Sequence, residues 1–128
     1  MYQFIRFLGW LIVILYLLSV DRYYLRLGPF QRNESLKTIR LFLVKRHKIF
    51  GICAFVIGLI HGFLAFTRIS PSLTGSLTLF LMITTVAIGI GLHYKKIKLS
   101  GMKTHRTISI LIVVGIVVHV LYPYLFLY

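Results

Sequence analysis

Four of the five histidines in the sequence form two pairs with the same spacing. His47 and His61 are 14 residues apart, and so are His105 and His119. On an α-helix, 14 residues return a side chain to within about 40° of its starting direction, over a rise of about 21 Å. Each pair therefore lies on one face of a helix, at two levels. If both helices run in the same direction, His47 comes level with His105, and His61 with His119.

Two imidazoles that face each other from separate helices suit the iron of haem. Haem iron takes two axial ligands on opposite sides of the macrocycle, and the protein supplies them from opposite walls. A zinc site needs three or four ligands that converge at about 2.0 to 2.3 Å, and histidines about 21 Å apart on one helix cannot share one ion. The only acidic residues, Asp21 and Glu34, fall in a basic segment, so no carboxylate completes a di-iron or transporter site. The spacing predicts two b-type haems, with one histidine pair at each level.

Basic residues and glycines beside the histidines are candidates for further contacts with haem. The propionates of haem are anionic and costly near hydrocarbon, so neighbouring cations would pair with them. Glycine lets a flat macrocycle approach the backbone. Cations that mark topology and small residues that pack helices are the alternatives. The candidates are the cations Lys45, Arg46, Lys48, Arg106 and Arg68, and the glycines Gly51, Gly62 and Gly115.

A hydrogen bond between helices is the alternative role for any single intramembrane histidine. Two equal spacings on two helices of the same direction favour ligation instead. The fifth histidine, His93, lies beside Tyr94 and Lys95, near the level of His47 and His105. We expect His93 to be an interfacial residue or a propionate partner, and replacement of one of the two nearby ligands is the alternative.

Four apolar segments are long enough to carry these residues through a membrane. Each is close to the roughly 20 residues that span the hydrocarbon core. Of the 128 residues, 59% are hydrophobic and 13% are charged, whereas soluble domains average about 25% charged, so the apolar excess faces lipid. The sequence predicts one all-α membrane domain over residues 1–128, an up-down bundle of four transmembrane helices. The expected spans are roughly Phe4 to Val20, Ile49 to Thr67, Leu73 to His93, and Thr107 to Tyr128.

Positive charge is concentrated in the first and third connections between these spans. Of the 15 Lys and Arg residues, eight lie between Asp21 and Lys48, five between Lys95 and Arg106, and only Arg68 in the second connection. Because cytoplasmic loops are enriched in Lys and Arg, we expect both basic connections inside the cell membrane and both termini outside. The net charge is +13, but long apolar runs interrupt the cations, so nucleic acid is not an expected partner.

The first connection contains a break followed by a new helix start. Gly28-Pro29 interrupts regular structure, and Asn33 or Ser35 can cap a helix that continues into the second span. Counted from Leu36 to Thr67, this helix would be about 48 Å long, which exceeds the bilayer core. Its amphipathic, basic start would therefore project beyond the membrane.

Two tight turns complete the expected topology. Ser70-Pro71-Ser72 would connect the second and third spans. Residues Lys98 to Thr104, which include Gly101, would connect the third and fourth.

The histidines and their basic neighbours form one pattern, Arg46-His47 and His105-Arg106 with His61 and His119 further on. From Lys45 to Tyr128, the chain resembles the transmembrane haem domain of the ferric reductase and NADPH oxidase superfamily, and more loosely the small cytochrome b families. The resemblance implies that histidines on two helices hold two stacked haems, which pass electrons between the membrane faces. The chain departs from the large members of the superfamily because it has four predicted helices rather than six and no flavin or nicotinamide domain.

The sequence predicts a b-type cytochrome subunit that carries electrons, not a complete enzyme. Haem iron with both axial positions filled favours outer-sphere electron transfer over oxygen binding. We expect a cytoplasmic flavin or iron-sulfur subunit as the electron donor, steered by the positive surface. One alternative is a quinone-reactive anchor subunit, in which Tyr122, Tyr124 or interfacial cations bond a quinone carbonyl. The other is a haem-free structural or assembly subunit.

Overall fold

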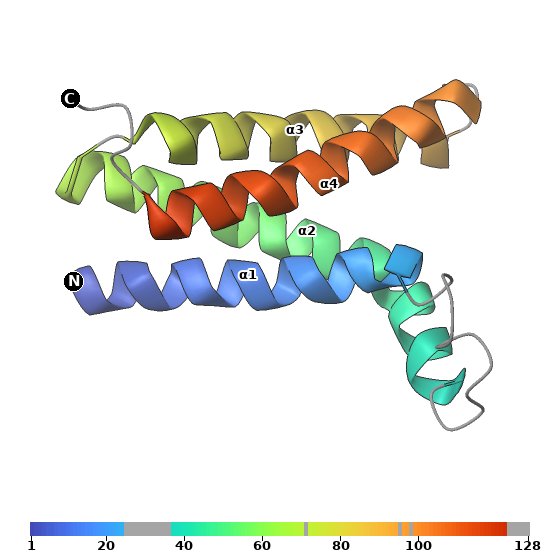
Figure 1. The fold of residues 1–128 in the computed structure, drawn as a ribbon, viewed down its shortest axis with the longest axis horizontal. Coiled ribbons are helices and arrows are strands. Elements are labelled where there is room, and N and C mark those ends of the chain that lie inside the picture. Colours follow the sequence, from blue (N-terminus) through green and yellow to red (C-terminus); the bar gives the residue numbers. More distant parts are fainter. Residues whose placement is uncertain (25–36, 71, 95, 98, 123–128) are drawn as a thin grey trace.

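The computed structural model describes residues 1–24, 37–70, 72–94, 96–97 and 99–122. Its elements are α1 (Tyr2–Tyr24), α2 (Lys37–Arg68), α3 (Leu73–His93) and α4 (Leu99–Leu121). Successive helices run in opposite directions, so α2 and α4 point the same way (Figure 1). All four are long and apolar enough to cross a membrane. The predicted all-α, up-down bundle of four helices is confirmed.

The helices match the predicted spans in number and order, and their boundaries differ most in α1 and α4. α1 ends at Tyr24 and not at Val20, and α4 extends from Leu99 to Leu121 and not from Thr107 to Tyr128. The third span coincides with α3, and α2 begins one residue after the predicted start of the projecting helix. The turn expected over Lys98 to Thr104 is wrong, because α4 already begins at Leu99. Gly101 lies inside α4, where a Cβ atom would collide with the side chain of Ile97. This glycine serves close packing and not chain reversal.

Some expected features lie outside the described residues. They are the Gly28-Pro29 break, the caps Asn33 and Ser35, Pro71 of the second turn, and Tyr124. Ser72, the last residue of that turn, is the N-cap of α3, and its hydroxyl accepts a hydrogen bond from the Gly75 amide.

The bundle consists of two antiparallel hairpins, α1 with α2 and α3 with α4, which meet along α2 and α3. Apolar side chains fill the middle of the bundle. The hydroxyl of Tyr16 on α1 donates to the Ser109 carbonyl on α4 at 3.0 Å and so joins the two hairpins. The buried core residues are Ile12, Tyr16, Ala54, Met82 and Ile112.

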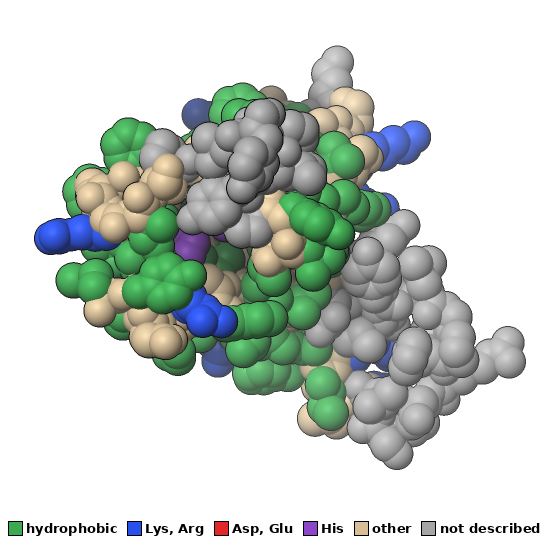
Figure 2. Space-filling view, turned by 60° about the vertical axis from the view of Figure 1, so that its left-hand side comes forward, with side chains coloured by type: hydrophobic (Ala, Val, Ile, Leu, Met, Phe, Trp, Pro, Cys, Tyr) green, Lys and Arg blue, Asp and Glu red, His purple; other side chains and the backbone are tan. Residues whose placement is uncertain are grey.

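The outer surface of the bundle is apolar. Phe63, Phe66 and Phe80, on α2 and α3, are 63% to 68% exposed. Hydrophobic side chains also cover much of the described surface in Figure 2. Side chains of this kind stabilise a helix in lipid and not in water, so the chain has the properties of a multi-pass integral membrane protein.

Candidate functional site

The structure brings the four equally spaced histidines together in two pairs between the diagonal helices α2 and α4. The ring centroids of His47 and His105 are 6.3 Å apart, with an angle of 84° between the ring planes. Those of His61 and His119 are 6.5 Å apart, with an angle of 82°. No hydrogen bond joins the two rings of either pair, all of which lie in the described part of the chain. Each pair of imidazoles therefore faces across a gap.

The width of this gap matches the space that one metal ion needs. An imidazole nitrogen lies about 2.0 Å from a bound metal ion and about 1.15 Å from the centre of its own ring. Two imidazoles on opposite sides of one ion therefore have centroids about 6.3 Å apart. The observed separations of 6.3 and 6.5 Å agree with this value at both levels.

Neighbouring helices hold the Nδ1 atoms of the pair formed by His47 and His105. The His47 Nδ1 bonds the backbone carbonyl of Ser19 on α1. The His105 Nδ1 lies 3.1 Å from the Thr85 carbonyl on α3. A carbonyl oxygen only accepts, so in both residues Nδ1 carries the proton and the lone pair is on Nε2. Histidine ligands of metals are oriented in this way, with the second ring nitrogen bonded to a carbonyl or carboxylate.

The pair formed by His61 and His119 is held in a similar way. His61 Nδ1 donates to the carbonyl of Ile5 on α1 at 3.0 Å. His119 Nδ1 lies 3.1 Å from the hydroxyl of Thr74 and 3.3 Å from that of Ser72, at the start of α3. Histidine atoms are visible in a hollow at this end of the bundle, where α1 begins (Figure 2). In both pairs, α1 anchors the histidine of α2, and α3 anchors the histidine of α4.

Glycines on the anchoring helices give three of the rings their positions. A Cβ atom on Gly9 would lie 3.3 Å from His61 Cε1, and a Cβ atom on Gly89 would lie 3.3 Å from His105 Cε1. Each of these glycines lies four residues after the residue whose carbonyl accepts the Nδ1 bond. A ring can reach that carbonyl because the next turn of the helix has no side chain in its path. At Gly75, the equivalent Cβ atom would be only 2.9 Å from His119 Cε1.

The glycines predicted from the sequence have different surroundings. A Cβ atom on Gly62 would contact Leu79, and one on Gly115 would approach the Thr78 hydroxyl at 2.8 Å, so both glycines face α3. Around Gly51, one turn after His47, nothing lies within 4 Å of the Cβ position. Of the three glycines predicted to lie beside haem, Gly51 is therefore the one with open space beside it.

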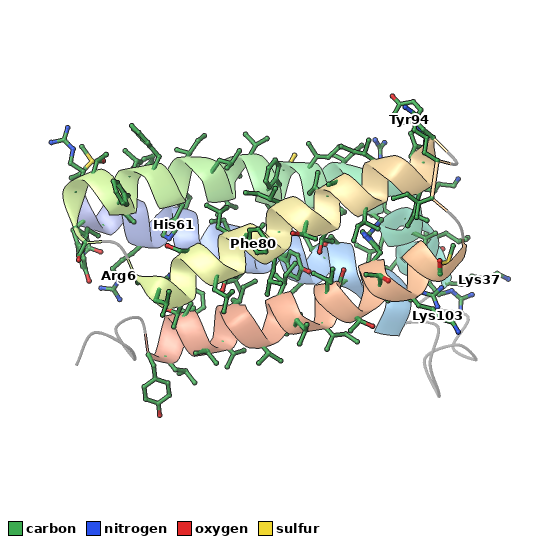
Figure 3. All side chains as sticks on the ribbon, turned by 90° about the horizontal axis from the view of Figure 1, so that it is seen from above. Arg6, Lys37, His61, Phe80, Tyr94 and Lys103 are labelled. Atoms are coloured by element: carbon green, nitrogen blue, oxygen red, sulfur yellow. The ribbon has the colours of Figure 1, made fainter. Side chains whose placement is uncertain are left out.

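The predicted cations lie at the two ends of the bundle. Lys45, Arg46, Lys48 and Arg106 are exposed at the end where α2 and α4 begin, which we call the basic end. Arg106 also donates to Met102 Sδ at 3.4 Å. Arg68 is exposed at the opposite end, where Arg6 of α1 also lies, close to the labelled His61 (Figure 3).

His93 does not join either pair. Its Nδ1 lies 2.9 Å from the Lys48 Nζ, and its ring centroid is 5.1 Å from that of Tyr94. These contacts place His93 at the exposed surface of the basic end. These contacts are compatible with the interfacial position expected for His93.

One buried polar atom beside the site has no partner. Among the described residues, the Thr85 Oγ1 is the buried side-chain atom that makes no hydrogen bond, although the Thr85 carbonyl accepts from His105. Other helical threonines bond the carbonyl four residues earlier, as Thr78 and Thr84 do. An orphaned hydroxyl at the level of His105 fits a wall that faces a bound group. The imidazole pairs, the open space at Gly51 and this hydroxyl are together compatible with haem.

Sequence reasoning missed the residues that orient the histidines. The carbonyls of Ile5, Ser19 and Thr85 have no sequence signature, because every residue has a carbonyl. Gly9 did carry a signal, since glycine costs about 1 kcal/mol relative to alanine inside a helix and indicates a packing reason there.

Each pair of imidazoles has the geometry to bind one metal ion from two opposite sides. This geometry suits a metal centre that needs two trans axial donors. No group of three or more His, Cys, Asp or Glu side chains gathers within the described residues. Comparison of the chain with protein-family models, with curated proteins and with solved structures finds no match.

Proposed function

We propose that the chain is a dihaem b-type cytochrome that carries electrons through the membrane. The observation that supports this most is the geometry of the two histidine pairs, whose centroids are 6.3 and 6.5 Å apart at two levels of one bundle. One haem would be held by His47 and His105, and the other by His61 and His119. When bound, haem iron carries one electron by alternating between its ferric and ferrous states.

The chain contributes orientation to this chemistry. Hydrogen bonds between Nδ1 and groups of α1 and α3 hold the rotation of each imidazole, which would leave Nε2 for the iron. Because both axial positions would be occupied by protein, small molecules such as oxygen would have no site on the iron. Outer-sphere electron transfer is the reaction that such a centre supports.

The two histidine pairs would mark two points on an electron path through the bundle. On α2 and on α4, 14 residues separate the two histidines, a rise of about 21 Å along the bundle. The volume between the two levels is filled by the core that contains Tyr16 and Met82, which excludes water. Electrons would pass between the two membrane faces, as the resemblance to the ferric reductase and NADPH oxidase superfamily implies.

The partners follow from the charge at the basic end. With both basic connections in the cytoplasm and both termini outside the cell membrane, the pair of His47 and His105 would be the inner pair. A cytoplasmic flavin or iron-sulfur subunit with an acidic surface would then dock there and donate electrons. Quinone is the second candidate partner, because the Lys48 ammonium, 2.9 Å from the His93 ring and next to His47 in the sequence, would be available to bond a quinone carbonyl.

The contacts of the histidines support a haem-free structural role less well than they support haem binding. A structural role accounts for the hydrogen bonds between the histidines and the helices α1 and α3. It does not explain why the rings of α2 and α4 face each other without a hydrogen bond at the separation expected for a shared metal ion.

The test is the haem content and absorption spectrum of the chain purified from native membranes with its bound subunits. We expect a red protein with two b haems and low-spin spectra that respond little to carbon monoxide. His93→Ala is the matched control and should retain both haems. A colourless protein from haem-sufficient cells would contradict the proposal, and a single haem would show that the pairing is wrong.

A further inference from the structure

The first turns of α2, Lys37 to Lys45, form a stem that leaves the direction of the bundle. In Figure 1 the stem turns away at a steep angle to the other helices, beside the end of α1. The axis of the bundle approximates the membrane normal, because all four helices are long and apolar enough to span the bilayer. The stem therefore runs closer to the membrane plane than to the normal.

A contact between two aromatic rings shows which side of the stem faces the membrane. The ring centroids of Phe42 and Phe50 are 6.3 Å apart, with an angle of 60° between the planes. In a straight helix, residues eight positions apart are separated by about 12 Å along the axis. The rings meet because they lie on the concave side of the bend. Phe42 thus points toward the side on which α2 enters the bilayer.

The apolar residues Ile39 and Phe42 lie on one side of the stem, and two of its three cations lie on the other. By helical geometry, Ile39 is about 60° from Phe42, whereas Lys37 and Arg40 are about 140° and 160° away from it; Lys45, at the end of the stem, is about 60° from Phe42 on the side away from Ile39. Ile39 and Phe42 are 54% and 53% exposed, although both are large and apolar. The apolar face of the stem is therefore uncovered and lies on the membrane side, opposite the two cations.

We propose that the stem is an interfacial helix that binds the anionic lipid surface at the basic end of the bundle. Its apolar face would enter the boundary between headgroups and acyl chains, and its Lys and Arg side chains would reach the phosphates. Helices that lie in the membrane interface have this division of residue types. The transmembrane part of α2 holds the stem at this depth, so lipid is the surface that Ile39 and Phe42 meet.

This anchor would fix the first turns of α2, which end at Lys45, two residues before His47. It also leaves the cationic face directed toward water. The stem would therefore set the depth and tilt of α2 at the basic end. The inference does not depend on the proposed haems, since it rests on the bend, the ring contact and the exposed apolar face.

The test measures which solvent surrounds each face of the stem. Two variants, Ile39→Cys and Arg40→Cys, are made in a Cys53→Ser background, labelled with a nitroxide and placed in vesicles of phosphatidylcholine and phosphatidylglycerol. Oxygen, which is concentrated in lipid, should relax the label at position 39 more strongly than a water-soluble nickel complex does. The order should be reversed at position 40. Preferential relaxation by nickel at both positions would overturn the proposal, as would a position 39 shielded from both reagents, which would indicate contact with protein.

A second comparison tests the anchor itself. Phe42→Ser should make the label at position 39 more accessible to the nickel complex, because it removes the larger apolar group of the apolar face. Lys37→Ser is the matched control and should leave the label in lipid. If the two substitutions changed the accessibility equally, or neither changed it, the apolar face would not be the anchor. Haem content, measured in parallel, reports separately on the proposed electron-transfer function.

Discussion

Replacing Gly75 with alanine should remove the haem held by His61 and His119. The new Cβ atom would lie 2.9 Å from His119 Cε1, whereas ordinary contacts begin at 3.4 Å, so the ring must retreat by 0.5 Å. Metal–ligand distances hold to within about 0.2 Å, so this displacement exceeds what the axial bond tolerates. The ring also cannot rotate away without losing its bond to Thr74.

Two further glycines supply a graded comparison. At Gly89, the Cβ atom would be 3.3 Å from His105 Cε1, so the ring needs to move by only 0.1 Å and haem should be retained. At Gly58, the nearest atom is the methyl group of Met82 at 3.6 Å, and alanine fits without movement. The alanines at positions 58 and 89 favour the helix by about 1 kcal/mol relative to glycine. At Gly75 the Cβ atom would also lie 2.8 Å from the capping hydroxyl of Ser72, so helix content is measured together with haem.

The assay is the ratio of haem to polypeptide, with helix content measured by circular dichroism. Gly75→Ala should hold one haem, whereas Gly89→Ala and Gly58→Ala should hold two. Two haems in Gly75→Ala, or equal loss in Gly58→Ala, would refute the steric reasoning.

Three other predictions follow from the same geometry. His61→Ala should remove one haem and leave the other, which difference spectra would show; loss of both in a folded protein would exclude independent levels. Tyr16→Phe should lower the free energy of unfolding by about 1 kcal/mol without changing haem content, because it removes one hydrogen bond to α4; an unchanged stability in denaturant would contradict this. Charge reversal at Lys37, Arg40 and Lys45 should slow electron entry and weaken its salt dependence in oriented vesicles; unchanged values would favour entry through quinone.

The apolar runs of the sequence predicted the helices well, because the bilayer imposes both their length and their composition. The start of α4 was missed for a physical reason. Lys103 and Arg106 ended the apolar run, but charge does not end a helix whose side chains have left the hydrocarbon. Gly101 was interpreted as a turn residue, although its role depends on the side chain of Ile97, which sequence patterns do not reveal.

The meeting of the histidines was also accessible from the sequence. Equal spacing on two helices of the same direction sets both level and side, so His47 faces His105 in the structure. The anchors were not accessible, because backbone carbonyls such as those of Ile5 and Thr85 are chosen by the packing of α1 and α3. Likewise, only the structure shows that Gly62 packs against α3.

The most direct measurement is the electron paramagnetic resonance spectrum of the oxidised protein. The imidazole planes are 84° and 82° apart in the two pairs. Nearly perpendicular axial imidazoles give low-spin ferric haem a highly anisotropic signal, whereas parallel imidazoles give a rhombic one. We predict two haems per chain, both with the highly anisotropic low-spin signal. The absence of haem or a high-spin signal would contradict ligation by these histidine pairs, and rhombic signals from both centres would contradict their nearly perpendicular orientation.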